Sequence, residues 1–310
     1  MTRRLAAAAV FAASLALAGC GLGAGPGSSD VRLTVTRDFG AHPVGQTRPA
    51  PTRGSENVIR FLERHFSVTT RYGGGFVQSI AGYGGGHQGG RPVDWFYYVN
   101  GVEAPRGAAS TPLHAGDRVW WDRHDWGTAM RVPAVVGSFP EPFLHGVKGK
   151  RLPVRVECAT DAGPACGAVA KALGDVQVLA ARALVATEGG DDSLRVVVGP
   201  WSGVRTDRAA RQVEQGPSAS GVYARFVAGG QRLELLDARG HVVKTLGPGG
   251  GLIAATRYRD QPPTWFVTGT DAAGAKAAAA LLDGGDLADR FALAVDAGRA
   301  VALPVAGGGA

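Results

Sequence analysis

The stretch at 93–101, Val-Asp-Trp-Phe-Tyr-Tyr-Val-Asn-Gly, constrains the fold more than any other part of this chain. Aromatic and β-branched residues favour strands, and the closing Asn-Gly pair is a strong hairpin-turn signal because both residues tolerate a positive φ. Side chains alternate across a strand, so Trp95 and Tyr97 face one side of the sheet while Phe96 and Tyr98 face the other. The stretch therefore predicts a strand with aromatic residues on both faces, followed by a turn.

One aromatic face must be core, and two expectations remain open for the other. In the first, it is exposed together with Trp120 or Trp121 and with Trp126, as a flat platform for a ring-shaped or sugar-like ligand. Asn100, at the end of the strand, is then counted among the binding residues. In the second, the aromatic residues of both faces are buried, and the platform does not exist.

A glycine-rich segment precedes the aromatic strand, with nine glycines in the 18 positions from Gly73 to Gly90. Glycine lets the backbone approach a ligand closely, so the segment can hold Tyr83 or His87 over the platform. A mobile surface loop between strands is the alternative. It is not a nucleotide-binding loop, because the pattern Gly-x-x-x-x-Gly-Lys-Ser/Thr occurs nowhere in the chain.

The neighbouring segments predict a small α+β unit. Alternating apolar and polar residues indicate a strand at 31–36, and the apolar spacing at 55–66 predicts a helix with Ser55 as its N-cap. Further strands are expected at 76–80 and 118–122. The expected order is strand, helix, then strands joined by glycine-rich turns.

Two motifs together carry a resemblance to a known family. These are the aromatic stretch at 93–101 and the segment Leu-His-Ala-Gly-Asp-Arg-Val-Trp-Trp at 113–121. Over residues 31–126 the chain resembles the bacterial domain family related to the transcobalamin C-terminal domain. The resemblance implies a β-grasp-like fold. Because the animal relatives close over one face of cobalamin, it also implies cobalamin or a related small molecule as the ligand.

The N-terminus has the pattern of a secreted lipoprotein. Two arginines precede an apolar stretch at 5–18, which is about 21 Å long as a helix and too short for a bilayer core of about 30 Å. The Leu-Ala-Gly-Cys that follows resembles the bacterial lipoprotein processing site. We therefore expect residues 1–19 to be removed as a signal peptide, Cys20 to be lipidated, and the Gly/Ser-rich segment 20–30 to be a flexible tether.

Charge and composition indicate two domains and no nucleic-acid partner. The formal net charge is +7 and falls to +5 without the leader, and the basic residues are spread rather than clustered. Residues 31–145 hold eight of the twelve Trp and Tyr residues, whereas residues 150–310 are rich in Ala, Val, Leu and Gly. The proline-rich segment 139–143 and the basic segment 148–151 mark the expected linker.

The second region repeats a plan of strand, small-residue loop and alanine-rich helix. Strands near 154–157, 195–199 and 265–269 each lead through a Thr-Asp pair to a helix, whose N-terminus that pair can cap. An antiparallel pair is expected at 232–237 and 241–246. The fold class is therefore α+β, with a β-grasp-like domain followed by an α/β domain that has a mixed sheet.

The cysteines fit an oxidising compartment. With Cys20 assigned to lipid, Cys158 and Cys166 remain, and such a pair outside the cytoplasm usually forms a disulfide. A zinc site is the alternative, but these two cysteines lack the further ligands that zinc needs.

Catalytic and metal signals are weak. The histidines and aspartates at 114–125 lack a metal-binding spacing, and the Asp-Arg-His-Asp run at 122–125 is more typical of a solvated turn. No Gly-x-Ser-x-Gly elbow occurs. We therefore expect neither an enzyme nor a bound cofactor or metal.

These observations favour a lipid-anchored ligand-binding protein on the extracytoplasmic side of the cell membrane. In this hypothesis the aromatic domain captures a small molecule, with cobalamin as the candidate, and delivers it to a membrane transporter. The alternative is a structural or interaction lipoprotein of the cell envelope that binds a protein or glycan partner.

Overall fold

The computed structural model describes residues 28–72, 75–186, 190 and 192–307. The predicted signal peptide, Cys20 and most of the tether lie outside the described residues. About 20% helix and 39% strand, arranged in several mixed sheets, confirm the α+β class. No helix in this part of the chain is both long and apolar enough to cross a membrane.

The first region is built around a mixed sheet with the order β2-β1-β9-β7-β6, and β8 pairs with β7. Strand β1 runs parallel to β9, and β7 runs antiparallel to it. A smaller antiparallel sheet has the order β3-β4-β5. The elements of this region are β1 (Arg32–Arg37), β2 (His42–Gln46), α1 (Val58–His65), β3 (Val68–Arg71), β4 (Phe76–Ile80), β5 (Tyr83–Gly84), β6 (Gly86–Gln88), β7 (Arg91–Val99), β8 (Val102–Glu103), η2 (Ala108–Ser110) and β9 (Arg118–Asp125).

Helix α1 covers one face of this sheet. It begins later than predicted, because Asn57, and not Ser55, is the N-cap and accepts a hydrogen bond from the backbone N–H of Arg60. Its buried side chains include Phe61 and Leu62, which confirms the predicted apolar face. The helix is short because the chain becomes extended again at its C-cap, just before β3.

The predicted hairpin turn is confirmed. Asn100 and Gly101 have φ values of 54° and 72°, so both adopt the left-handed conformation that a tight turn between β7 and β8 requires. A Cβ atom on Gly101 would lie 2.8 Å from the carbonyl oxygen of Val135, so the close approach of the chain also requires glycine.

The second region is a larger mixed sheet with the order β11-β10-β12-β17-β16-β18-β19. Strands β11, β10, β12 and β17 are parallel, whereas β16, β18 and β19 pair antiparallel. Its elements are β10 (Val154–Cys158), α2 (Pro164–Asp175), β11 (Ala180–Leu184), β12 (Leu194–Pro200), α3 (Trp201–Val204), α4 (Arg208–Glu214), α5 (Pro217–Ser220), β13 (Ala224–Val227), η3 (Ala228–Gly230), β14 (Arg232–Leu236), β15 (Val242–Leu246), β16 (Gly251–Thr256), β17 (Thr264–Gly269), α6 (Ala272–Ala280), α7 (Gly284–Leu287), β18 (Ala292–Asp296) and β19 (Arg299–Leu303).

The three predicted strand-loop-helix units are present, and two of the three predicted caps are confirmed. Asp207 accepts hydrogen bonds from the first turn of α4, and Asp271 accepts one from the backbone N–H of Gly274 in α6. Helix α2 differs, because its N-cap is Gly163, which makes no side-chain cap. The predicted antiparallel pair, β14 and β15, is also confirmed, but it belongs to a separate sheet with β13.

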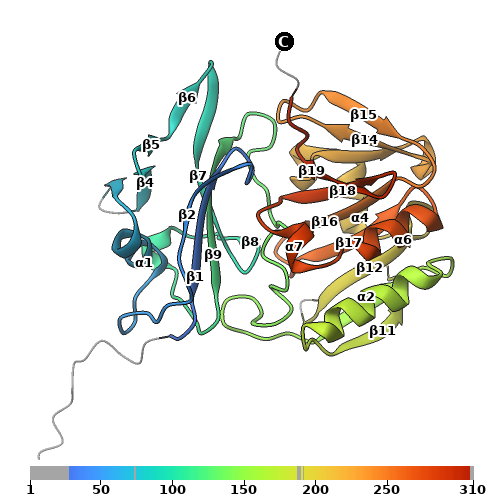
Figure 1. Cartoon of the computed structure of the whole chain (residues 1–310), viewed down its shortest axis with the longest axis horizontal. Coiled ribbons are helices and arrows are strands. Elements are labelled where there is room, and N and C mark those ends of the chain that lie inside the picture. Colours follow the sequence, from blue (N-terminus) through green and yellow to red (C-terminus); the bar gives the residue numbers. More distant parts are fainter. Residues whose placement is uncertain (1–27, 73–74, 187–189, 191, 308–310) are drawn as a thin grey trace, which may run out of the picture.

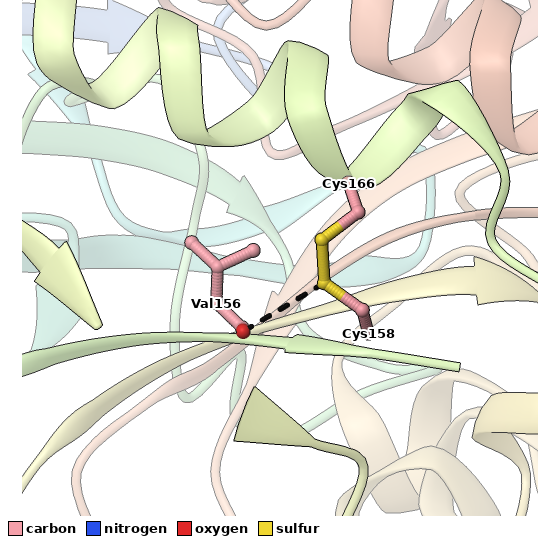
Figure 2. Close-up of a disulfide and its surroundings, with 3 residues drawn as sticks. All are labelled: Val156, Cys158 and Cys166. Carbon is pink, nitrogen blue, oxygen red and sulfur yellow. Dashed lines mark hydrogen bonds between the residues drawn. A yellow bond between two sulfur atoms is a disulfide. The ribbon is translucent and has the colours of Figure 1, made fainter. Parts of the chain in front are cut away.

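The predicted disulfide between Cys158 and Cys166 is confirmed and joins the end of β10 to the first turn of α2 (Figure 2). The Sγ atom of Cys158 also lies 3.8 Å from the carbonyl oxygen of Val156. The bond fixes the N-terminus of α2 at the carboxyl end of the parallel strand, in a helix whose N-cap supplies no side-chain hydrogen bond.

We expect removal of this disulfide to destabilise the second region. The bond closes a loop with a sequence separation of 8 residues, for which the chain-entropy model gives about 2–3 kcal/mol. The double substitution of Cys158 and Cys166 by alanine should therefore lower the free energy of unfolding by that amount, measured by urea denaturation. An unchanged denaturation midpoint would contradict the prediction.

The sheet of the first region lies between α1 and the second region (Figure 1). One apolar cluster includes Phe61, Trp95 and Trp121 and fills the space toward α1. The other includes Tyr98 and Trp120 and is continuous with the core of the second region. Both faces of the sheet are therefore covered.

The segment expected as a linker takes part in the second core. Phe139 and Phe143 are buried, and their rings lie 6.1 and 5.0 Å from that of Trp265 on β17. The basic residues of the segment 148–151, Lys148, Lys150 and Arg151, are exposed. The prolines between the phenylalanines therefore shape a packed connection rather than a solvated one.

Candidate functional site

The predicted aromatic platform is not exposed. On the face toward α1, Trp95, Tyr97 and Trp121 retain only 6%, 8% and 2% of their surface, and the rings of Tyr97 and Trp121 stack with centroids 4.7 Å apart. On the opposite face Tyr98 is completely buried against Phe291 of the second region. The second of the two sequence expectations, burial of both faces, therefore describes this sheet.

Asn100 is also buried, and its side chain supports the hairpin. The side-chain amide donates to Oδ1 of Asp117 and to the carbonyl oxygen of Gly146, at 2.9 Å each. Its Oδ1 atom accepts from the backbone N–H of Arg118 at 2.9 Å. Because all these partners belong to the chain itself, we assign Asn100 a structural contribution in this conformation.

The remaining predicted binding residues are accessible, and one of them, Tyr83, meets the buried set through its carbonyl oxygen, which accepts from Nε1 of Trp95 at 2.9 Å. Tyr83 and His87 are exposed on the short strands β5 and β6, and Trp126 is half-buried just after β9. The guanidinium of Arg37 lies 4.1 Å from the centroid of the Tyr83 ring. The described part of the glycine-rich segment is thus partly strand rather than an open loop.

A cleft lies where the two regions meet, beside the sheet of the first region. Its volume is about 740 Å³, within the range of about 300–1,000 Å³ that is typical of small-molecule sites. Residues of β1, β2, β6, β7 and β9 or their flanking turns form one wall. The other wall comes from three parts of the second region: the turn between β14 and β15, the segment between α7 and β18, and residues 302–307. The lining residues are Asp38, Phe39, Gly40, Ala41, His42, Gln88, Arg91, Val93, Asp125, Ala238, Arg239, Ala288, Asp289, Arg290, Ala302, Pro304, Val305, Ala306 and Gly307.

The cleft carries charges of both signs. Arg91 forms an ion pair with Asp125, and His42 lies 3.0 Å from a carboxylate oxygen of Asp38. Burial, and then the nearby carboxylate of Asp122, raise the pKa of Asp289 on the opposite wall. The site therefore presents carboxyl, guanidinium and imidazole groups to a ligand, which suits a polar molecule.

A buried hydrogen-bond network holds the floor of the cleft. Asp122 accepts hydrogen bonds from the hydroxyl of Thr36 at 2.5 Å and from the backbone N–H groups of Phe39 and Gly40 at 3.0 and 2.9 Å. Its other contact is with Nδ1 of His124, at 2.9 Å. The sequence interpretation of this run as a solvated turn is wrong, because β9 continues to Asp125 and the second region covers its face.

The ring of His124 lies in an aromatic box between the two regions. Its centroid is 4.6 Å from that of Phe39, 4.5 Å from that of Phe96 and 5.2 Å from that of Phe291. Phe291 comes from the turn before β18 and also contacts Trp120. The box fixes the angle at which the first region meets the second, and so the shape of the cleft.

This network does not have the geometry of a nucleophile and its base. In a hydrolytic triad the histidine binds the nucleophilic hydroxyl, whereas here Asp122 lies between Thr36 and His124. All three side chains are buried. Within the described residues no group of three or more His, Cys, Asp and Glu side chains is placed to hold a metal ion.

Comparison with known proteins gives one family match, and it lies in the first region. Residues 55–125 match the model of a domain of unknown function, DUF4430. No curated protein matches the chain. A solved structure from Ruminococcus gnavus, described as that of a "putative metal binding protein", is 13% identical, with a TM-score of 0.24 over 32% of this chain and 97% of that one.

Sequence reasoning missed the cleft because its walls come from segments far apart in the chain. Asp38 and Asp289 face the same hollow although about 250 positions separate them. One signal was available: Asp122 and His124 share a strand face with Trp120, which the period of two predicts. That pattern indicates a buried polar pair once the face is known to be covered.

Proposed function

We propose that this chain is a lipid-anchored, extracytoplasmic ligand-binding protein that holds a small polar molecule in the cleft between its two regions. The observation that carries the proposal is the cleft of about 740 Å³ itself, with ionisable groups from both regions on its walls. Cobalamin or a related molecule is the first candidate, on the resemblance of residues 31–126. Delivery to a membrane transporter is the corresponding cellular role.

The proposal places the ligand away from the aromatic strand. Because the second region covers the face with Tyr98 and Trp120, a ligand cannot stack there without separating the two regions. Arg91 and Asp289 face the open cleft and can donate to or accept from polar groups of a ligand. Binding between two regions also offers a simple means of release, since a small change in their angle would open the site.

The test is calorimetric titration of cobalamin into the soluble chain that starts at Ser28. We expect saturable binding, and we expect Ala41→Trp to weaken it at least about tenfold, because the indole would occupy the cleft that Ala41 lines. Ala109→Trp is the matched control, since Ala109 is exposed beside α1 on the other side of the sheet. Equal affinities for the unsubstituted chain, Ala41→Trp and Ala109→Trp would contradict the placement of the ligand in the cleft. Absence of heat would exclude cobalamin as the ligand.

One observation favours the alternative, an envelope protein that binds a protein or glycan partner. Tyr72 is 87% exposed and Phe76 40% exposed, at the end of the small sheet β3-β4-β5. Large aromatic side chains at such exposure are typical of interaction surfaces. If the cobalamin titration is silent and cross-linking in the envelope captures a partner that Tyr72→Ser and Phe76→Ser both lose, this function replaces the first.

A further inference from the structure

Two arginines lie side by side at the end of the sheet opposite the cleft. Arg32 begins β1 and Arg118 begins β9, and they are register partners in this parallel pair. They therefore share a sheet face with Thr34 and Trp120, the face that meets the second region. Neighbouring like charges repel, so this arrangement needs a compensating group.

The described part of the chain supplies no carboxylate that pairs with either arginine. Neither side chain forms an ion pair there, and the Arg118 guanidinium donates instead to the carbonyl oxygens of Ser138 and Phe139, at 3.3 and 2.7 Å. Burial lowers the pKa of Arg118, the nearby carboxylate of Glu141 acts in the opposite direction, and the charge of Arg32 adds a smaller lowering. By contrast, Arg195 contacts two carboxylates.

A pocket of about 310 Å³ opens beside the pair and is lined by polar groups. The side chains of Thr34, Gln46 and Ser138 line it and make no hydrogen bond to any described residue. The hydroxyl of Thr47 accepts from the backbone N–H of Leu33 and retains its own hydrogen for a ligand. The pocket thus offers hydroxyl and amide donors in addition to the two guanidinium groups.

The acidic groups nearby leave this pocket cationic. The charged side chains that line it are the two guanidinium groups of Arg32 and Arg118 and one carboxyl, that of Asp289. A second hollow of about 290 Å³ on the other side of the pair is lined by Asp30 and Glu141, and Glu141 already contacts Nδ1 of His145 at 2.5 Å. An anion is therefore favoured in the first pocket rather than in the second.

We propose that Arg32 and Arg118 bind the phosphate group of a small anionic ligand in the 310 Å³ pocket. Two guanidinium forks and several hydroxyl donors exceed what the two oxygens of a carboxylate can use, whereas a tetrahedral phosphate has enough acceptor oxygens for them. The phosphate can belong to a free small molecule or to a lipid headgroup. Ala288 and Asp289 line both this pocket and the cleft, but Arg32 and Arg118 line the pocket and not the cleft, so the proposal does not depend on the function proposed for the cleft.

The test is titration of inorganic phosphate, and separately of glycerol 3-phosphate, into the soluble chain from Ser28 at low ionic strength. We expect saturable binding that Arg32→Gln weakens about tenfold, the loss of one charge-assisted contact. Arg32 is the position to substitute because it is exposed and its side chain makes no hydrogen bond to the described residues, so its replacement removes no such contact. Arg60→Gln removes the same charge from the exposed side of α1 and should change the affinity less than twofold.

Vesicles distinguish the two sources of phosphate. Cosedimentation with phosphatidylglycerol vesicles, but not with phosphatidylcholine vesicles, that is lost in Arg32→Gln would assign the site to a lipid headgroup. Binding of the free phosphates alone would assign it to a soluble ligand. No saturable binding of any of these probes, equal loss in Arg32→Gln and Arg60→Gln, or acetate competing as well as phosphate would overturn the proposal.

Discussion

Replacement of Asp122 by alanine is expected to lower the free energy of unfolding by about 3–5 kcal/mol. The carboxylate is completely buried and accepts hydrogen bonds from the Thr36 hydroxyl and the backbone N–H groups of Phe39 and Gly40. Alanine would leave these donors and His124 without their acceptor in a site from which water is excluded. Each such unsatisfied group costs about 1–3 kcal/mol.

The same substitution should also weaken ligand binding in the cleft, because Phe39 and Gly40 line it. The measurement is urea denaturation followed by tryptophan fluorescence, with cobalamin titration of the folded fraction. Asp161→Ala is the matched control: Asp161 is exposed and its side chain makes no hydrogen bond to any of the residues that the structure describes, so the expected change is within about 0.5 kcal/mol. A loss below about 1 kcal/mol for Asp122→Ala would show that the Asp122 network does not stabilise the contact between the two regions.

Replacement of Arg195 by methionine is the second large expected effect, a loss of about 3–5 kcal/mol. The guanidinium donates to both carboxylate oxygens of Glu157, at 2.9 and 2.6 Å, and lies 2.7 Å from a carboxylate oxygen of Asp207. All three side chains are buried in the second region. Methionine keeps much of the volume but leaves two buried carboxylates without a cation.

Arg155→Met provides the control for this cluster. Arg155 is the register partner of Arg195 on the neighbouring strand, but its side chain is exposed and forms no ion pair within the described residues. Thermal denaturation should show a large decrease in the melting temperature for Arg195→Met and a small one for Arg155→Met. Equal decreases for the two variants would mean that the loss of stability comes from the position on the sheet and not from the buried charge.

The elements that follow from local chemistry could be predicted from the sequence. The alternation of Trp95 and Phe96 across β7 depends only on the geometry of a strand. The turn at Asn100 depends on a left-handed backbone conformation, and the cap at Asp207 on the unpaired N–H groups of a helix start. The disulfide is expected because the predicted leader would direct the chain to an oxidising compartment.

The candidate site could not be predicted in the same way. Whether Tyr98 is exposed depends on the second region, whose Phe291 lies almost 200 positions away in the chain. The pair Asp122 and His124 has the composition of a solvated turn, and only the covering region makes it a buried network. The helix cap expected from Thr160-Asp161 is absent because α2 starts later, at Pro164 with the disulfide beside it.

The most direct test of the central claim is a crystal structure of the chain from Ser28 grown with saturating cobalamin. The account predicts a ligand in contact with both regions, against Asp38 and Arg91 on one wall and Asp289 and Val305 on the other. A ligand bound instead on the exposed strands around Tyr83 would contradict the account. So would a cleft left open at a concentration that saturates the protein in solution.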